Sequence, residues 1–279
     1  MSRKIKKEAL VKAVEEMVIQ ASYEPEPETE KLLQQAEKKE TSPSAKTALQ
    51  IILENIQLAR KKKKPLCQDT GLSIFFIKIG RELELDFNLE QAINQGLAGA
   101  SEKGYLRPSV ADPLSRKNTG NNTPAIIHYQ LAEGDRLEIE LLLKGAGSEN
   151  KSRAEILSPA QGQEGIKSLV LKTVEQAGSQ SCPPLIIGLG IGGSLEMSAL
   201  LAKKALLRSP GSKNPDPELA RLEKELKEEI NQLGIGASGL GGEVTCLSVQ
   251  AEKFFGHIAS LAITVNLQCW AHRYARRVL

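Results

Sequence analysis

The stretch CQDTG, residues 67–71, followed by LSIFFIKI, residues 72–79, sets a thiol, an amide and a carboxylate at the start of an apolar strand. The second run is dense in β-branched and aromatic residues, which favour strands. Pro65 ends the helical pattern before it. Binding and catalytic groups are commonly placed where loops join such strands. A buried structural cysteine followed by a polar turn would have the same sequence. Other parts of the chain must therefore decide between a functional site and this plainer interpretation.

Composition describes a globular protein. With 279 residues and 41% hydrophobic content, the chain can bury a real core and form one domain or two closely joined lobes. It contains no apolar run of the roughly 18 residues that a membrane helix requires, and Met1–Gln20 is charged throughout. We therefore expect a cytoplasmic protein with neither a membrane span nor a secretory signal.

Net charge and cysteine usage further narrow the functional classes to which the protein could belong. A net charge of +3 is too small to suggest a nucleic-acid partner, and the basic run RKKKK, residues 60–64, fits a solvated helix end better than a phosphate-binding patch. The four cysteines form no Cys-x-x-Cys pair. They do not resemble a disulfide framework, so reduced thiols that ligate a metal or simply pack are the alternatives.

The order of elements indicates an α+β fold more than a regular βαβ series. A helical N-terminal part, about residues 1–64, precedes mixed α/β lobes. Later helices are expected over residues 160–177, 195–208 and 217–232, and strands over residues 72–79, 136–143, 243–249 and 261–267. The polar segment SPGSKNPDP, residues 209–217, is the clearest linker and a possible boundary between sub-lobes of a single domain, 1–279.

A glycine motif offers one functional alternative. Gly188, Gly190 and Gly193 satisfy G-x-G-x-x-G after an apolar run, which on its own would nominate a nicotinamide-binding oxidoreductase. The sequence shows no second parallel strand ending in an acidic residue about twenty positions later. We therefore interpret the glycines as a turn near the site, where backbone segments approach closely.

Six motifs, in one order, closely resemble the α subunit of two-component class I fumarate hydratases and L-tartrate dehydratases, which are iron–sulfur hydro-lyases. The motifs are PLCQDTG (65–71), RPSVADPLSRKNTGNNTPAIIH (107–128), KGAGSEN (144–150), CPPLIIGLGIGG (182–193), GIGASGLGG (234–242) and QCWAHR (268–273). The resemblance extends from about the first helix to the last residues.

The resemblance implies a cofactor. In the family three thiolates hold a [4Fe–4S] cluster whose fourth iron stays open to substrate, and those positions fall on Cys67, Cys182 and Cys269. The spacings alone match no local cluster signature. Cys246, in a strand-like run, is left over and is expected to pack as a small hydrophobe.

The resemblance also assigns site residues. Asp69 would perform acid/base work, acting through a threonine of a partner subunit, while Gln68 orients substrate. Arg107 would clamp a carboxylate with its guanidinium fork, and His257 matches a substrate-contacting histidine. Each has a plainer alternative: a turn cap for the aspartate, a surface arginine, a structural histidine.

The loop KGAGSEN adds backbone groups to this expected site. Gly145, Ala146 and Gly147 follow a strand and offer N–H donors suited to an anion, so we expect them to bind substrate. The family usually has glycine at the middle position.

The expected activity is reversible hydration of fumarate to (S)-malate, a step of the tricarboxylic acid cycle, with the open iron as Lewis acid. L-tartrate dehydration to oxaloacetate is the alternative within the class. A cluster-bearing structural or regulatory protein without activity is a further alternative. Because the chain ends at Leu279, soon after Cys269, we expect a separate β subunit to complete the site for a small dicarboxylate, in an α2β2 assembly.

Overall fold

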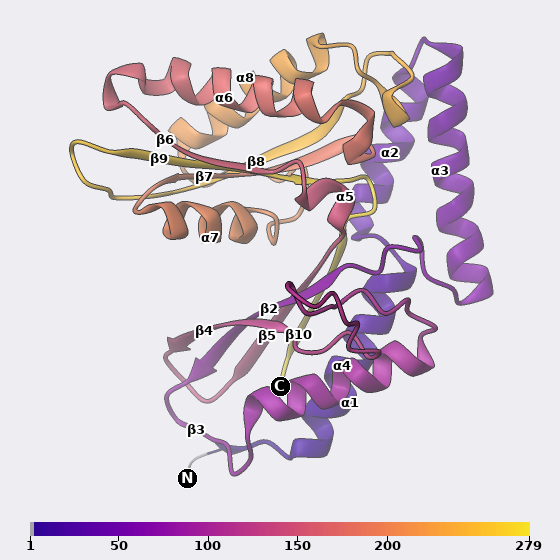
Figure 1. The fold of residues 1–279 in the computed structure, drawn as a ribbon, viewed down its shortest axis with the longest axis vertical. Coiled ribbons are helices and arrows are strands. Elements are labelled where there is room, and N and C mark those ends of the chain that lie inside the picture. The colour runs from indigo at the N-terminus through magenta and orange to yellow at the C-terminus, as the bar shows by residue number, and fades with distance from the viewer. Residues whose placement is uncertain (1–2) are drawn as a thin grey trace. The chain divides into compact units, whose positions relative to one another are not determined.

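The computed structural model describes residues 3–279, which divide into two compact units (Figure 1). One unit comprises residues 3–26, 55–146 and 273–279, and the other comprises 27–54 and 147–272. Each is therefore assembled from separate segments of the chain. The polar segment 209–217 lies inside the second unit.

The first unit is built on a four-stranded sheet in the order β10-β5-β2-β4. Its strands are β2 (Leu72–Gly80), β4 (Ile126–Ala132), β5 (Leu137–Lys144) and β10 (Arg273–Val278). β2 pairs in parallel with β4, whereas β5 is antiparallel to both β2 and β10. A short parallel ladder joins β1 (Arg3–Lys4) to β3 (Leu83–Glu84).

Helices α1 (Lys7–Tyr23) and α4 (Leu89–Lys103) supply the rest of this core. Leu10, Val14 and Met17, three or four residues apart, form the buried stripe of α1, within the part that the sequence predicts to be helical. Burying one such side chain contributes about 1.5–3 kcal/mol. Gly96 lets the two helices approach closely, because a Cβ there would lie 2.7 Å from the carbonyl oxygen of Val11.

The second unit contains a sheet in the order β6-β9-β7-β8. Its strands are β6 (Arg153–Leu157), β7 (Leu185–Gly192), β8 (Cys246–Phe254) and β9 (Leu261–Gln268). Helices α6 (Gly162–Ala177) and α8 (Pro217–Gln232) cover one face and α7 (Leu195–Ala205) covers the other (Figure 1). α2 (Pro27–Lys39) belongs to this unit, and α3 (Pro43–Lys62) begins in it.

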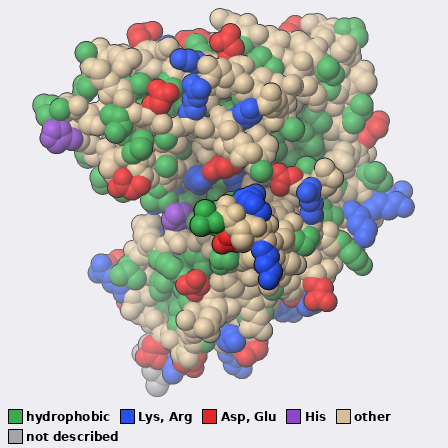
Figure 2. Space-filling model, in the orientation of Figure 1, with side chains coloured by type: hydrophobic (Ala, Val, Ile, Leu, Met, Phe, Trp, Pro, Cys, Tyr) green, Lys and Arg blue, Asp and Glu red, His purple; other side chains and the backbone are tan. Residues whose placement is uncertain are grey.

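The mixed α+β class and the helical N-terminal part are confirmed. The sequence missed α4, β6 and the charged strand β10 as elements. No helix within residues 3–279 is long and apolar enough to span a lipid bilayer. Acidic and basic side chains are both scattered over the face drawn in Figure 2.

A buried carboxylate fixes the start of α3. Glu40, only 3% exposed, accepts hydrogen bonds at Oε1 from the backbone N–H of Thr41 (3.0 Å) and Ser42 (2.9 Å). Its Oε2 accepts from the backbone N–H of Glu243 at 3.0 Å. Bonds from N–H groups to a charged acceptor are stronger than neutral ones. Glu40 thus joins the N-terminus of α3 to the loop before β8.

We expect Glu40→Gln to destabilise the protein by about 1–3 kcal/mol, because a neutral amide leaves buried N–H donors with weaker or missing acceptors. Urea denaturation followed by circular dichroism measures this. Glu228→Gln, which removes only the exposed pair with Lys224 at 3.9 Å, is the control and should change stability by less than about 0.5 kcal/mol. Equal stability of the two variants would contradict the role given to Glu40.

Candidate functional site

One edge of the first unit's sheet collects several expected site residues. Leu143 of β5 lies between Ser73 of β2 and Arg273 of β10, and Leu72 lies opposite Lys144. The loop that enters β2 and the loop that leaves β5 therefore emerge side by side. These are the CQDTG and KGAG segments, so the sheet register itself brings the two motifs together.

Asp69 connects these two loops. Its Oδ1 accepts a hydrogen bond from the backbone N–H of Gly71 at 3.0 Å, which is the turn-capping role. Its Oδ2 accepts from the backbone N–H of Ala146 at 2.7 Å. The anion that the KGAG loop binds here is thus the protein's own carboxylate. The Ala146 N–H, expected to bind substrate, is already used by Asp69.

Two glycines make this close approach possible. Gly71 has φ +75°, and a Cβ on it would lie 2.5 Å from the carbonyl oxygen of Lys144. A Cβ on Gly145 would lie 2.9 Å from Asp69 Oδ2 and 3.2 Å from Arg273 Nη2. Any larger residue at either position would push the loops apart or displace the carboxylate.

Arg107 is tied to the same edge through its backbone. Thr70, 3% exposed, donates its hydroxyl to the carbonyl oxygen of Arg107 at 2.6 Å. The buried amide of Asn122 donates to the same oxygen at 3.3 Å and accepts from the Ser109 N–H at 2.6 Å. The Arg107 and Gln68 side chains are exposed. Thr70 and Asn122 were not expected to support the site, although both lie within the quoted motifs.

The second unit brings two of the expected thiols together. Cys182 lies just before β7, and Cys269 directly follows β9. These two strands are antiparallel, with Ile186 opposite Gln268. The backbone N–H of Trp270 donates to the carbonyl oxygen of Cys182 at 3.4 Å. Cys182 is exposed and Cys269 is half-buried. Both thiols therefore lie at one edge of this sheet.

Gly147 lies beside the cysteine loop of the second unit. It belongs to the short helix α5 (Ala146–Glu149), and a Cβ on it would lie 3.6 Å from the carbonyl oxygen of Gln180. Glu149 anchors that helix, accepting hydrogen bonds from Lys203 Nζ at 2.6 Å and Asn266 Nδ2 at 2.9 Å. The part of the KGAG loop in this unit is thus fixed next to residues 178–182.

Cys246 differs from the other three cysteines. It begins β8, is completely buried, and its Sγ donates to the carbonyl oxygen of Ser248 at 3.3 Å. Burial raises the pKa of its thiol to about 12. A thiol that resists ionisation is unsuited to ligate iron, which agrees with its expected packing role.

Two of the three cysteines expected to hold an iron–sulfur cluster, Cys182 and Cys269, lie in the same unit. Cys182 and Cys269 are accessible thiols on adjacent loops, as two ligands of one cluster must be. Cys67, half-buried, belongs to the first unit. Within residues 3–279, no group of three or more His, Cys, Asp or Glu side chains is already arranged around a single metal position.

His257 is not near the two thiols of its own unit, Cys182 and Cys269. It lies between β8 and β9, whereas Cys269 follows the far end of β9, and the eight residues of that strand span roughly 23 Å. The exposed imidazole borders a groove of about 440 Å³ together with Phe254, Phe255 and Leu195. Its Nδ1 accepts from the backbone N–H of Ala259 at 3.1 Å.

The glycine motif provides the expected close approach of backbone segments, and it does so between β7 and α7. A Cβ on Gly188 would lie 2.0 Å from the carbonyl oxygen of Ala202, and one on Gly190 would meet that of Ser198 even more closely. These glycines let α7 pack directly against β7. The turn at Gly193 lies at the end of β7 remote from Cys182, so it is not beside that thiol.

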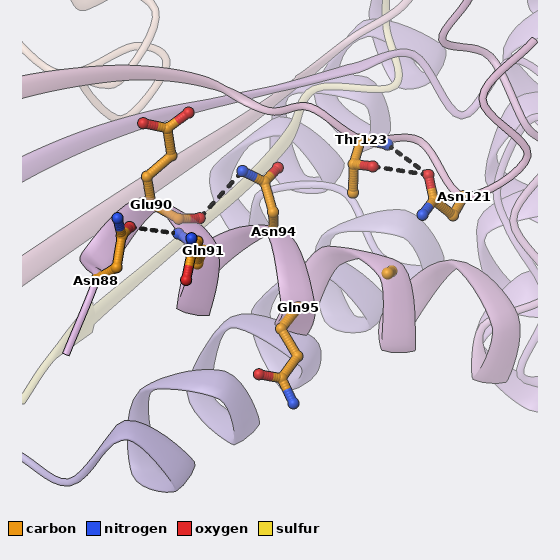
Figure 3. A pocket seen from close by; sticks show the side chains of 8 residues that line it. Asn88, Glu90, Gln91, Asn94, Gln95, Asn121 and Thr123 are labelled. Carbon is orange, nitrogen blue, oxygen red and sulfur yellow. Dashed lines mark hydrogen bonds between the residues drawn. The ribbon is translucent and has the colours of Figure 1, made fainter.

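A separate groove of about 540 Å³ in the first unit is rich in carboxamides (Figure 3). Several of them already serve the backbone. Asn88 Oδ1 accepts from the Gln91 N–H and caps α4, Asn94 Oδ1 accepts from the Ala125 N–H, and Asn121 Oδ1 accepts from Thr123. Asn121 thus caps a turn.

Comparison with known proteins identifies the family of the chain. The family model described as fumarate hydratase (Fumerase) matches residues 11–278. A Methanocaldococcus jannaschii protein, provisionally named L(+)-tartrate dehydratase subunit alpha, is 45% identical over 263 residues, 91% of this chain and 92% of that protein. The L(+)-tartrate dehydratase subunit alpha of Escherichia coli K12 and that of Shigella sonnei are each 35% identical over 245 residues, 86% of this chain and 81% of each relative. The chain therefore belongs to the fumarate hydratase (Fumerase) family of class I hydro-lyases.

Proposed function

We propose that the chain is the α subunit of an iron–sulfur hydro-lyase that interconverts fumarate and (S)-malate. The observation that carries the proposal is the paired anchoring of the Asp69 carboxylate by the Gly71 and Ala146 N–H groups, within motifs that the family match covers. Dehydration removes a hydroxyl from one carbon and a proton from its neighbour, so it needs a fixed proton acceptor.

Asp69 is our proposed acid/base group. Its two backbone bonds set the direction of the carboxylate without a side-chain partner that would have to move during reaction. In the dehydration direction it accepts the proton lost from substrate carbon, directly or through a hydroxyl of the partner subunit. In hydration it returns that proton. Thr70 and Gly71 hold the loop that carries it.

A dicarboxylate substrate also requires cations and donors. Arg107 can reach outward from a backbone fixed by Thr70 and Asn122, which suits a carboxylate clamp, and Gln68 is exposed beside Asp69. Gly145 and Gly147 would bring backbone close to the bound acid. His257 lies too far from Cys182 and Cys269 within its own unit, so it would contact a substrate there only from another chain of the assembly.

Cys67, Cys182 and Cys269 are our proposed ligands for a [4Fe–4S] cluster. When bound, such a cluster with one iron free of protein thiolate supplies a Lewis acid that polarises the departing hydroxyl. The exposed position of Cys182, the half-buried positions of Cys67 and Cys269, and the complete burial of Cys246 support this choice. Reduced thiols of this kind favour a cytoplasmic setting.

We further propose a separate β subunit and an α2β2 assembly. The relatives are named as alpha subunits, which supports the existence of a second component. A dianionic substrate needs more cationic contacts than Arg107 supplies. Dehydration of L-tartrate is the second candidate activity, because the relatives carry that name. The two dehydrations differ by one substrate hydroxyl.

Replacing Cys67, Cys182 or Cys269 singly with Ser should abolish cluster binding, because a neutral hydroxyl is a poor iron ligand. Iron and acid-labile sulfide, measured after anaerobic reconstitution, report this without turnover. Cys246→Ser is the matched control and should retain the cluster. Full cluster content in Cys269→Ser would remove that residue from the ligand set.

The α chain with its cluster rebuilt should be at least roughly a thousandfold less active alone than with its β subunit, because a whole set of transition-state contacts is missing. Steady-state fumarate hydration with and without the second chain measures this. Equal rates would show that the α chain carries a complete site.

A substrate panel should separate the two activities. We expect the complex to have its highest kcat/KM for fumarate or (S)-malate, with L-tartrate disfavoured by about tenfold or more, since one unmatched polar group commonly costs this much. Direct assay of fumarate and oxaloacetate formation supplies the measurement. A preference for L-tartrate would establish the second candidate instead.

A further inference from the structure

We infer that Arg273 is the residue that positions Asp69 for proton transfer, a role that rests on the proposed function. Arg273 opens β10 and is 2% exposed, which makes it the largest fully buried side chain in the described residues. Arginine is almost never buried without a partner that requires it. Its contacts show which partner that is.

The guanidinium reaches the CQDTG loop directly. Arg273 Nη1 donates to the backbone carbonyl oxygen of Asp69 at 2.6 Å, a short charge-assisted bond. Three bonds therefore fix Asp69: its carbonyl through Arg273, and its two carboxylate oxygens through Gly71 and Ala146. Rotation of the Asp69 side chain would break the two bonds that the Gly71 and Ala146 N–H groups donate to its carboxylate.

A second atom of the same guanidinium faces the carboxylate across Gly145. Asp69 Oδ2 lies 2.9 Å and Arg273 Nη2 lies 3.2 Å from the point where a Gly145 Cβ would stand. The two charged atoms are thus no more than about 6 Å apart, within the range of charge–charge attraction. Arg273 forms no ion pair among the described residues, and its buried Nε has no hydrogen-bond partner.

An unpaired buried cation weakens stability unless an anion compensates it. The fold buries the Arg273 guanidinium at the start of β10, against the proposed acid/base residue Asp69. A lysine could supply the positive charge. It lacks the planar fork of donors with which Arg273 binds the Asp69 carbonyl oxygen and at the same time faces its carboxylate. The geometry thus assigns Arg273 a role in orienting Asp69 as well as in packing.

Hydrogen exchange tests this positioning without any turnover. In the purified full-length chain, Arg273→Gln should speed exchange of the Gly71 and Ala146 amides by about tenfold or more, since both donate to the released carboxylate. Arg276→Gln is the matched control on the same strand, because it removes only an exposed ion pair with Glu138. It should leave both amides protected. Unchanged exchange in Arg273→Gln would overturn the proposal, and equal acceleration of amides throughout the unit would show a purely structural role.

Kinetics of the reconstituted αβ complex supply the second test. Arg273→Gln should lower kcat by roughly a hundredfold with KM within a few-fold, because misplacement of a catalytic group acts on the chemical step. Arg273→Lys should recover only part of the loss. Gly145→Ala, which keeps both charges but crowds the carboxylate, should lower kcat in the same way.

A double-mutant cycle distinguishes a failed inference from a failed function. If Arg273 acts through Asp69, Asp69→Asn with Arg273→Gln should be no slower than Asp69→Asn alone. Additive losses of rate would contradict the positioning role of Arg273 but would not contradict the proposed hydro-lyase function. A wild-type complex with full cluster and no turnover of any hydroxy acid would reject the proposed function, and the exchange result would still decide what Arg273 does.

Discussion

The two backbone hydrogen bonds to the Asp69 carboxylate are the constraint on which the candidate site depends. They join the loop entering β2 to the loop leaving β5, and they form only because Gly71 and Gly145 leave room between the loops. Thr70 extends the arrangement to the backbone of Arg107. A carboxylate that appears in the sequence as part of a polar turn is thus the centre of a small bonded framework at one sheet edge.

The second unit uses the same principle for its thiols. An antiparallel strand pair places the residue before β7 and the residue after β9 at one edge, and a backbone bond joins the two loops. In both units the sheet register, not proximity in sequence, brings the candidate site residues together. This explains why the cysteine spacings match no local signature.

Much of this was predictable, and the failures have physical causes. The helices expected over residues 160–177 and 217–232 correspond to α6 and α8, because each buries one stripe of side chains. α4 was missed since Gly96 and Gly99 weaken its helical pattern, although Asn88 marks its start. The glycines of β7 were assigned to the site, but they permit contact with α7.

Long-range contacts were beyond sequence reasoning. No local pattern places Arg273 against Asp69, because the contact depends on β10 returning to pair with β5. The same applies to His257, whose separation from Cys269 follows from the length and direction of β9. The family resemblance supplied residue names for the site, whereas the geometry shows which of them share one edge.

The central claim is that Asp69 moves the substrate proton in an iron–sulfur hydro-lyase. Its most direct test is turnover of Asp69→Asn in the αβ complex, with iron and sulfide content shown equal to wild type. The substitution is nearly isosteric but removes the basic oxygen, so we expect the rate of the hydration reaction to fall by about 10²–10⁴. A fully loaded Asp69→Asn enzyme that retains a rate within a few-fold of wild type would contradict the account.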